Sequence, residues 1–115
     1  MNITNDSARF DELQIKLLHW LAFSIQDSLR RAGVDEDKIA DLTEDLTFQT
    51  ACVFDNSTIM KHEGSPLVPI LTFATDEKRE NLVGVEGGSW MHEYAIGVAE
   101  SISAGGWSPH NEEKA

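Results

Sequence analysis

Basic residues are scarce in this sequence. Nine Lys and Arg stand against twenty Asp and Glu, which gives a formal net charge of −11 at pH 7. Proteins bind nucleic acid largely by neutralising phosphates with clustered Lys and Arg, and anionic membrane surfaces attract the same residues. We therefore expect neither nucleic acid nor a membrane as a partner. The charge instead favours solubility and rapid encounter with a basic protein.

Cysteine is almost absent, since Cys52 is the only one. An intramolecular disulfide is therefore impossible, which excludes a secreted scaffold built on disulfides. The N-terminal residues lack the basic segment and apolar run of a signal peptide, and no apolar stretch approaches the roughly 18 residues that span a bilayer. We expect a cytoplasmic protein, and no motif in it implies a cofactor.

The length leaves room for a single domain. The chain has 115 residues, of which 41% are hydrophobic and 25% charged, close to the average of globular proteins. A compact domain of this length has a radius of gyration of about 13 Å. We expect one α+β domain over residues 1–106 and a flexible polar tail over 107–115, from which Trp107 alone is able to fold back onto the domain.

Two helices are predicted in the first half of the chain. Residues 10–32 carry apolar side chains at steps of three or four, the pattern of a helix with one buried face: Phe10, Leu13, Leu17, Leu21, Ile25, Leu29 and Ala32. Asp6 or Ser7 is suited to cap its start and Gly33 to end it. A second helix starts near 35–37 and runs to about residue 54, carrying Ile39, Leu42, Leu46 and Val53. Residues 46–54 also alternate with period two, so a strand there is an alternative.

The second half of the chain predicts a small sheet and a third helix. Residues 61–66 read as a loop, and 67–75 and 82–86 as antiparallel strands. Pro69 places the first strand at a sheet edge or makes it start late. Ser89 is suited to cap a helix that carries Met91, Tyr94, Ala95, Val98 and Ile102. The fold class is therefore α+β, with two N-terminal helices, an antiparallel sheet of two or three strands and a C-terminal helix.

Two strands alone are only marginally stable. A third strand, or a second copy of the chain, is therefore expected to complete the sheet. We expect a homodimer, with residues 67–75 as the pairing edge.

Four carboxylates share one side of the second predicted helix. Asp37, Asp41, Glu44 and Asp45 follow at i, i+4, i+7 and i+8, opposite the apolar side chains. A calcium ion needs six to eight oxygens wrapped around it, which a straight helix face does not provide, so no metal site is expected. The stripe is either a solvated face or a docking surface for a basic partner. The second interpretation predicts a protein-interaction module, such as an inhibitor or immunity-type protein.

The turn at Gly87, Gly88 and Ser89 is the alternative site. A strand that passes through glycines into a helix start presents free backbone N–H groups, which bind anions. With Trp90 and His92, this turn predicts a small-molecule or anion site, with an enzymatic role as the weaker form of the hypothesis. The simpler interpretation is a tight turn and a helix cap.

Evidence for catalysis is thin. Gly87 and Ser89 match half of a nucleophile elbow, but Met91 stands where the second glycine belongs. Cys52 lies in an apolar run, where cysteine usually acts as a small buried hydrophobe. No catalytic residue is therefore expected. The four histidines, none of which has the spacing of a metal site, are His19, His62, His92 and His110.

Overall fold

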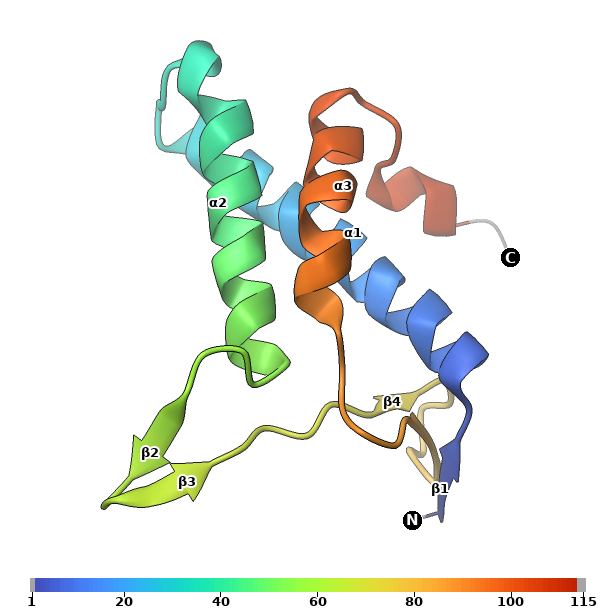
Figure 1. Ribbon diagram of the computed structural model, residues 1–115. Coiled ribbons are helices and arrows are strands. Elements are labelled where there is room, and N and C mark those ends of the chain that lie inside the picture. The colour runs from blue at the N-terminus through green and yellow to red at the C-terminus, as the bar shows by residue number, and fades with distance from the viewer. Residues whose placement is uncertain (1, 114–115) are drawn as a thin grey trace.

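The computed structural model describes residues 2–113, and it has the predicted α+β class. Three helices form its main body, with short strands at one end (Figure 1). The helices are α1 (Ser7–Arg31), α2 (Glu36–Phe54) and α3 (Met91–Ser103), followed by a short 3-10 helix, η1 (Pro109–Glu112). The strands are β1 (Asn2–Asn5), β2 (Met60–His62), β3 (Ser65–Leu67), β4 (Phe73–Ala74) and β5 (Asn81–Gly84).

The ends of the first two helices follow the predicted signals. The Asp6 carboxylate caps α1 by accepting the backbone N–H of Arg9 at 3.0 Å. Gly33 follows the helix with φ 79°, a left-handed conformation that glycine adopts without strain. The helix α2 is continuous to Phe54, so the strand alternative for residues 46–54 is wrong. No helix within residues 2–113 has the length and apolarity to cross a membrane.

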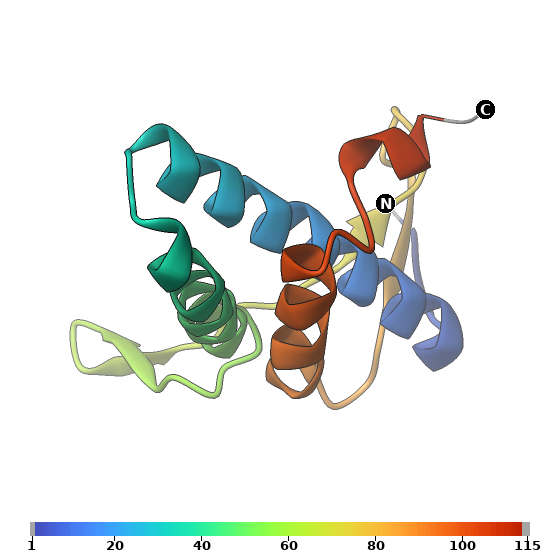
Figure 2. The ribbon, with the colours of Figure 1, turned by 90° about the horizontal axis from the view of Figure 1, so that it is seen from above.

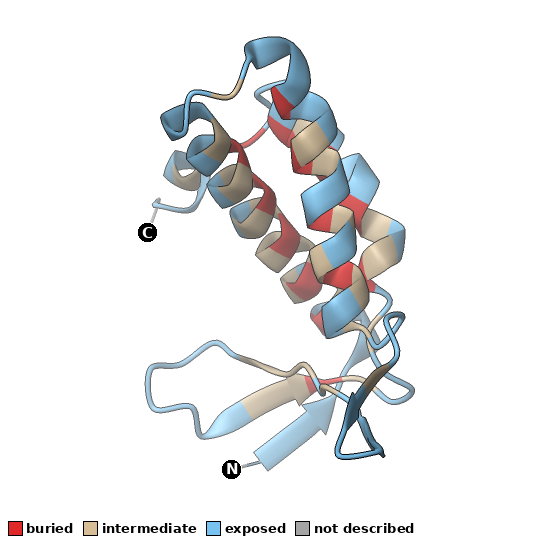
Figure 3. Cartoon of the chain, turned by 90° about the vertical axis from the view of Figure 1, so that its left-hand side faces the viewer, coloured by how far each residue is buried: buried red, intermediate tan, exposed pale blue. Residues whose placement is uncertain are grey.

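The faces that α1 and α2 bury differ from the predicted faces. In Figure 2, α1 crosses behind the other two helices, and in Figure 3 the buried residues line the space between helices. Because α1 contacts both α2 and α3, the predicted leucines Leu13, Leu17, Leu21 and Leu29 flank the line of closest approach and are only half-buried. The same holds for Leu42 of α2, while Leu46 and Val53 are exposed. Phe10 and Ile39 are buried as predicted, and the other buried positions are Gln14, Leu18, Ala22 and Gln26 on α1, and Thr43, Thr47 and Ala51 on α2.

The main sheet is mixed, and the expectation of a purely antiparallel sheet is wrong. Its strand order is β1-β5-β4, with β4 antiparallel and β1 parallel to β5. The predicted antiparallel pair exists, although only Phe73 and Ala74 of the longer predicted strand pair with β5, while Leu67 pairs with Met60 in the other sheet. The third strand comes from residues 2–5, where Ile3 lies opposite Leu82.

A second, two-stranded sheet occupies the segment predicted as a loop. Strands β2 and β3 pair antiparallel, with His62 opposite Ser65. The two turn residues, Glu63 and Gly64, have φ of 49° and 83°, as a type I′ hairpin turn requires. This hairpin extends away from the helices in Figure 1. The radius of gyration is accordingly 15.5 Å, larger than expected for a compact domain.

The chain after α3 returns to α1. Trp107 is buried and packs against the rings of His19, Trp20 and Phe23. Lys16 of α1 forms an ion pair with Glu112 of η1. Trp107 therefore folds back onto the domain as predicted, but not alone, because Glu112 also contacts α1. The division at residue 106 stays a prediction.

Candidate functional site

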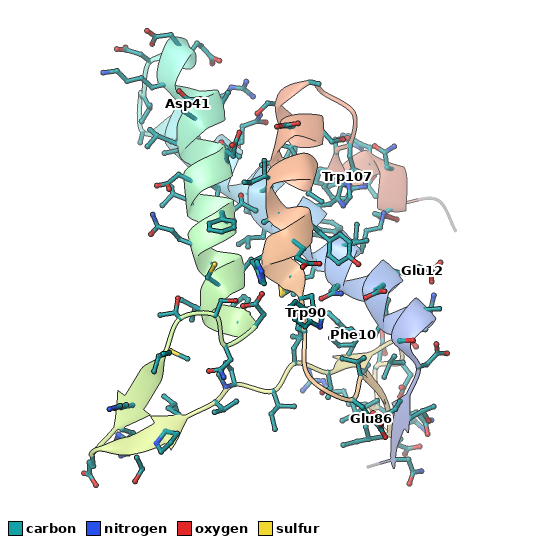
Figure 4. The ribbon with its side chains drawn as sticks, viewed as in Figure 1. Phe10, Glu12, Asp41, Glu86, Trp90 and Trp107 are labelled. Carbon is teal, nitrogen blue, oxygen red and sulfur yellow. The ribbon has the colours of Figure 1, made fainter. Side chains whose placement is uncertain are left out.

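The four carboxylates of the acidic helix face all lie on α2, and three of them border one groove. Asp37, Asp41 and Asp45 are exposed, while Glu44 is half-buried. Figure 4 shows Asp41 near the upper end of α2, far from the strands. Asp41, Glu44 and Asp45 line a groove of about 300 Å³ together with Phe48 and Ile96. Asp37 is not among the residues that line it.

The floor of this α2–α3 groove is apolar. Phe48 lies one turn beyond Glu44 on α2, and Ile96 comes from α3, which packs against α2. Ile96 is 41% exposed. Packing of a partner's apolar side chain on Ile96 would remove this exposed apolar surface from water, which is favourable. The groove therefore presents a negative rim around a surface that is suited to take an apolar side chain.

No salt bridge within the described residues neutralises the carboxylates of the acidic helix face. Within residues 2–113, none of Asp37, Asp41, Glu44 and Asp45 forms a salt bridge. Glu36, which precedes Asp37 in the first turn of α2, differs because it pairs with Arg30 at 3.0 Å. Asp45 accepts a hydrogen bond from the neutral Gln49 side chain at 2.9 Å, which leaves its charge uncompensated.

A second polar cluster joins the end of α2 to the start of α3. The Asp55 carboxylate, whose side chain is 0% exposed, accepts the backbone N–H of His92 at 2.9 Å and that of Ser57 at 3.0 Å. The Nδ1 atom of His92 lies 2.5 Å from Asp55 Oδ2. Asp55 therefore caps a helix from a distant part of the chain and places a negative charge at its positive end.

The pKa of Asp55 reflects these contacts. Burial by itself raises the pKa of the Asp55 carboxyl, but hydrogen bonds from Ser57 and His92 outweigh burial and hold the pKa below its usual value. The carboxylate is therefore charged at neutral pH. It is a structural anion that joins the end of α2 to the start of α3.

The predicted anion site at the glycine turn lacks free donors at the helix start. The helix α3 begins at Met91, with Trp90 at the N-cap position, so the expected capping position of Ser89 is wrong by one residue. Ser89 Oγ still accepts the Met91 N–H at 3.2 Å, and it donates to Gln14 Oε1 at 2.7 Å. Because Ser89 and Asp55 already occupy the Met91 and His92 amides, an anion that used these two amides would have to displace them.

The cluster does not have the geometry of a catalytic triad. Ser57 Oγ lies 3.1 Å from His92 Nδ1, the same nitrogen that contacts Asp55. In a triad the nucleophile and the carboxylate use opposite nitrogens of the imidazole, so that one nitrogen accepts the nucleophile's proton while the carboxylate holds the ring through the other. Here the imidazole is oriented by both groups and activates neither.

Cys52 is half-buried on α2. Burial, with a smaller contribution from the charge of Asp55, raises the pKa of the Cys52 thiol. A raised pKa keeps the thiol protonated at neutral pH, whereas a nucleophilic cysteine requires the thiolate. Within residues 2–113, no group of three or more His, Cys, Asp or Glu side chains is placed to hold a metal ion.

A larger cavity lies beside the glycine turn. Its volume is about 380 Å³, within the range of small ligand pockets. Trp90, which is exposed, and His92 are not among the residues that line it. Its walls combine the turn with the end of α2 and the chain after β3: Phe54, Asp55, Asn56, Val68, Pro69, Ile70, Leu71, Val85, Gly87, Gly88 and Ser89.

The acidic rim is recognisable in the sequence, but Ile96 and Asp55 are not recognisable there as parts of these sites. Ile96 gives no local signal because the other residues of the groove lie on α2. Asp55 has the sequence context of an ordinary residue at the end of a helix.

A scan against protein-family models, a search of curated proteins and a search of solved structures each found no match.

Proposed function

We propose that this protein is a non-catalytic binding module that holds a basic partner protein in the α2–α3 groove. The observation that carries the proposal is that Asp41, Glu44 and Asp45 line one groove together with the apolar side chains of Phe48 and Ile96. None of these three carboxylates forms a salt bridge within residues 2–113. This arrangement is complementary to a segment that presents an apolar side chain flanked by Lys or Arg. Such complementarity gives fast, specific association.

The partner class follows from the chemistry of the groove. A protein with a basic functional surface would be covered by this face, in the manner of an inhibitor or immunity-type protein. The net charge of −11 steers such a partner from a distance, and salt weakens this attraction. The single cysteine is consistent with work in the reducing cytoplasm, which we propose as the compartment.

Charge reversal in the groove tests the proposal. The probe is a synthetic helical peptide with leucines on one face and lysines on the other, and the readout is its Kd by calorimetry. Each exposed ion pair is worth up to about 1 kcal/mol, and reversal adds repulsion, so Asp41→Lys with Asp45→Lys is expected to weaken binding tenfold or more, about 1.4 kcal/mol.

The matched control is Glu77→Lys with Glu80→Lys in the exposed turn before β5, which changes the net charge by the same amount. It is expected to leave the Kd within a factor of about 3, less than 1 kcal/mol. Ile96→Ser adds an uncharged test, and it should also weaken binding. Equal losses in both double variants, or binding insensitive to Ile96, would show only general attraction to an acidic protein.

A further inference from the structure

The segment between β3 and β4 is apolar, uncharged and exposed. Residues 64–75 contain no Asp, Glu, Lys or Arg, the longest such run in the chain. Figure 1 shows the connection from β3 to β4 running below the ends of α2 and α3. Within it Ile70 is 86% exposed and Val68 54% exposed. Exposed aliphatic side chains at this density mark an interaction surface.

The backbone of the same segment is unpaired. Within residues 2–113, no backbone N–H or carbonyl of residues 68–71 bonds to another backbone group. Val68 and Ile70 are exposed whereas Pro69 and Leu71 are half-buried, the period-two alternation of an extended chain. An extended chain with free N–H and C=O groups is a template for another strand. We call residues 68–71 the edge segment.

The position of Pro69 permits such pairing. Successive residues of an extended chain direct their backbone groups to opposite edges, so Val68 and Ile70 share one edge and Pro69 faces the other. Proline lacks an N–H and is tolerated where its nitrogen faces away from the ladder. An antiparallel pair in which Val68 lies opposite Ile70 of a second copy places both Pro69 residues between the bonded pairs.

The surface is complementary to itself. Val68 and Ile70 protrude, and the same two residues line the cavity of about 380 Å³ beside the glycine turn. A two-fold axis at Pro69 therefore places the exposed Ile70 of each copy opposite Val68 of the other, a residue that lines that copy's cavity. Two copies of a chain with net charge −11 repel each other, and the edge segment itself contains no charged side chain that would add to this repulsion.

We infer that two copies of this chain associate through their edge segments, Val68 of each opposite Ile70 of the other, with each Ile70 closing the other copy's cavity. Each such pair exchanges both N–H···O bonds of an antiparallel ladder. This surface is separate from the α2–α3 groove, so the dimer leaves both grooves open to partners.

Sedimentation velocity on the wild-type chain and two variants tests the inference. Ile70→Lys is expected to give monomer where the wild type is dimer, because the lysine would be buried against Val68. The substitution also lowers the negative charge, so general repulsion cannot explain the loss. The control is Ile3→Lys, a 61% exposed position on β1 at the opposite edge of the sheet, which should remain dimeric.

Amide hydrogen exchange on the wild-type chain gives an answer that does not depend on a variant folding. Protection at the Val68 and Ile70 amides should rise with protein concentration, while the Leu71 amide, on the other edge, should not change. A wild-type chain that stays monomeric at about 1 mM, where even weak association is visible, would overturn the inference. A dimer that survives Ile70→Lys, or dissociates with Ile3→Lys, would overturn it too.

Discussion

Asp55 is the residue whose replacement tests the packing of the helices most sharply. The variant Asp55→Asn keeps the size of the side chain and removes its charge. The carboxylate is buried and holds the His92 amide, the His92 ring and the Ser57 amide. A charged hydrogen bond contributes about 1.5–3 kcal/mol, and an anion at a partly buried helix N-terminus up to about 2 kcal/mol. Asparagine retains one acceptor oxygen, so we expect a loss of about 2 kcal/mol.

The assay is urea unfolding at pH 7 followed by circular dichroism, with thermal unfolding as a second readout. For a domain of this size, about 2 kcal/mol corresponds to a Tm lower by roughly 8 °C. The control is Asp41→Asn, an exposed carboxylate within α2 that forms no ion pair in residues 2–113, and its unfolding midpoint should stay close to wild type.

The pH dependence gives the reasoning a second test. Hydrogen bonds from Ser57 and His92 hold the folded-state pKa of Asp55 below its usual value despite burial. The stabilisation is therefore complete above the unfolded pKa of about 3.9 and is lost as the pH falls through the lower, folded pKa. The gap between wild type and Asp55→Asn should be constant near neutrality and close in acid. Equal stability at pH 7, or a gap unchanged by acid, would refute the account.

Two further substitutions test the buried polar groups. Ser89→Ala removes the donor to the buried Gln14 oxygen and the acceptor of the Met91 amide, and it should lower the free energy of unfolding by about 2 kcal/mol; an unchanged value would show that neither bond matters. Thr47→Val removes a buried hydroxyl that has no hydrogen-bond partner within residues 2–113, and it should raise the free energy of unfolding by about 1 kcal/mol. The control Thr50→Val removes a hydroxyl that donates to the Leu46 carbonyl, and it should not raise the free energy of unfolding. A Thr47→Val variant that is less stable than wild type would contradict this.

The helices were predictable because their signals are local. Asp6, Gly33 and the acidic first turn of α2 each act on neighbouring backbone groups. Which face a helix buries is a property of its neighbours. The predicted leucine stripe of α1 is half-buried because two helices meet α1 along the adjacent line of Gln14 and Leu18.

The strands were harder because their partners are distant. The strand β1 has only Ile3 and Thr4 as local strand-forming residues, and it exists because Leu82 and Val83 lie beside it. The role of Asp55 has the same origin, since its partner His92 belongs to another helix. The acidic rim was visible in the sequence, while its apolar floor required the approach of α3.

The central claim is that the α2–α3 groove, and no other acidic surface, binds a basic apolar segment. An NMR titration of the isotopically labelled chain with the lysine-leucine peptide tests it directly. The account predicts that amide shifts concentrate at Asp41, Glu44, Asp45, Phe48 and Ile96. Shifts spread over every acidic segment, or centred on the turn before β5, would contradict it.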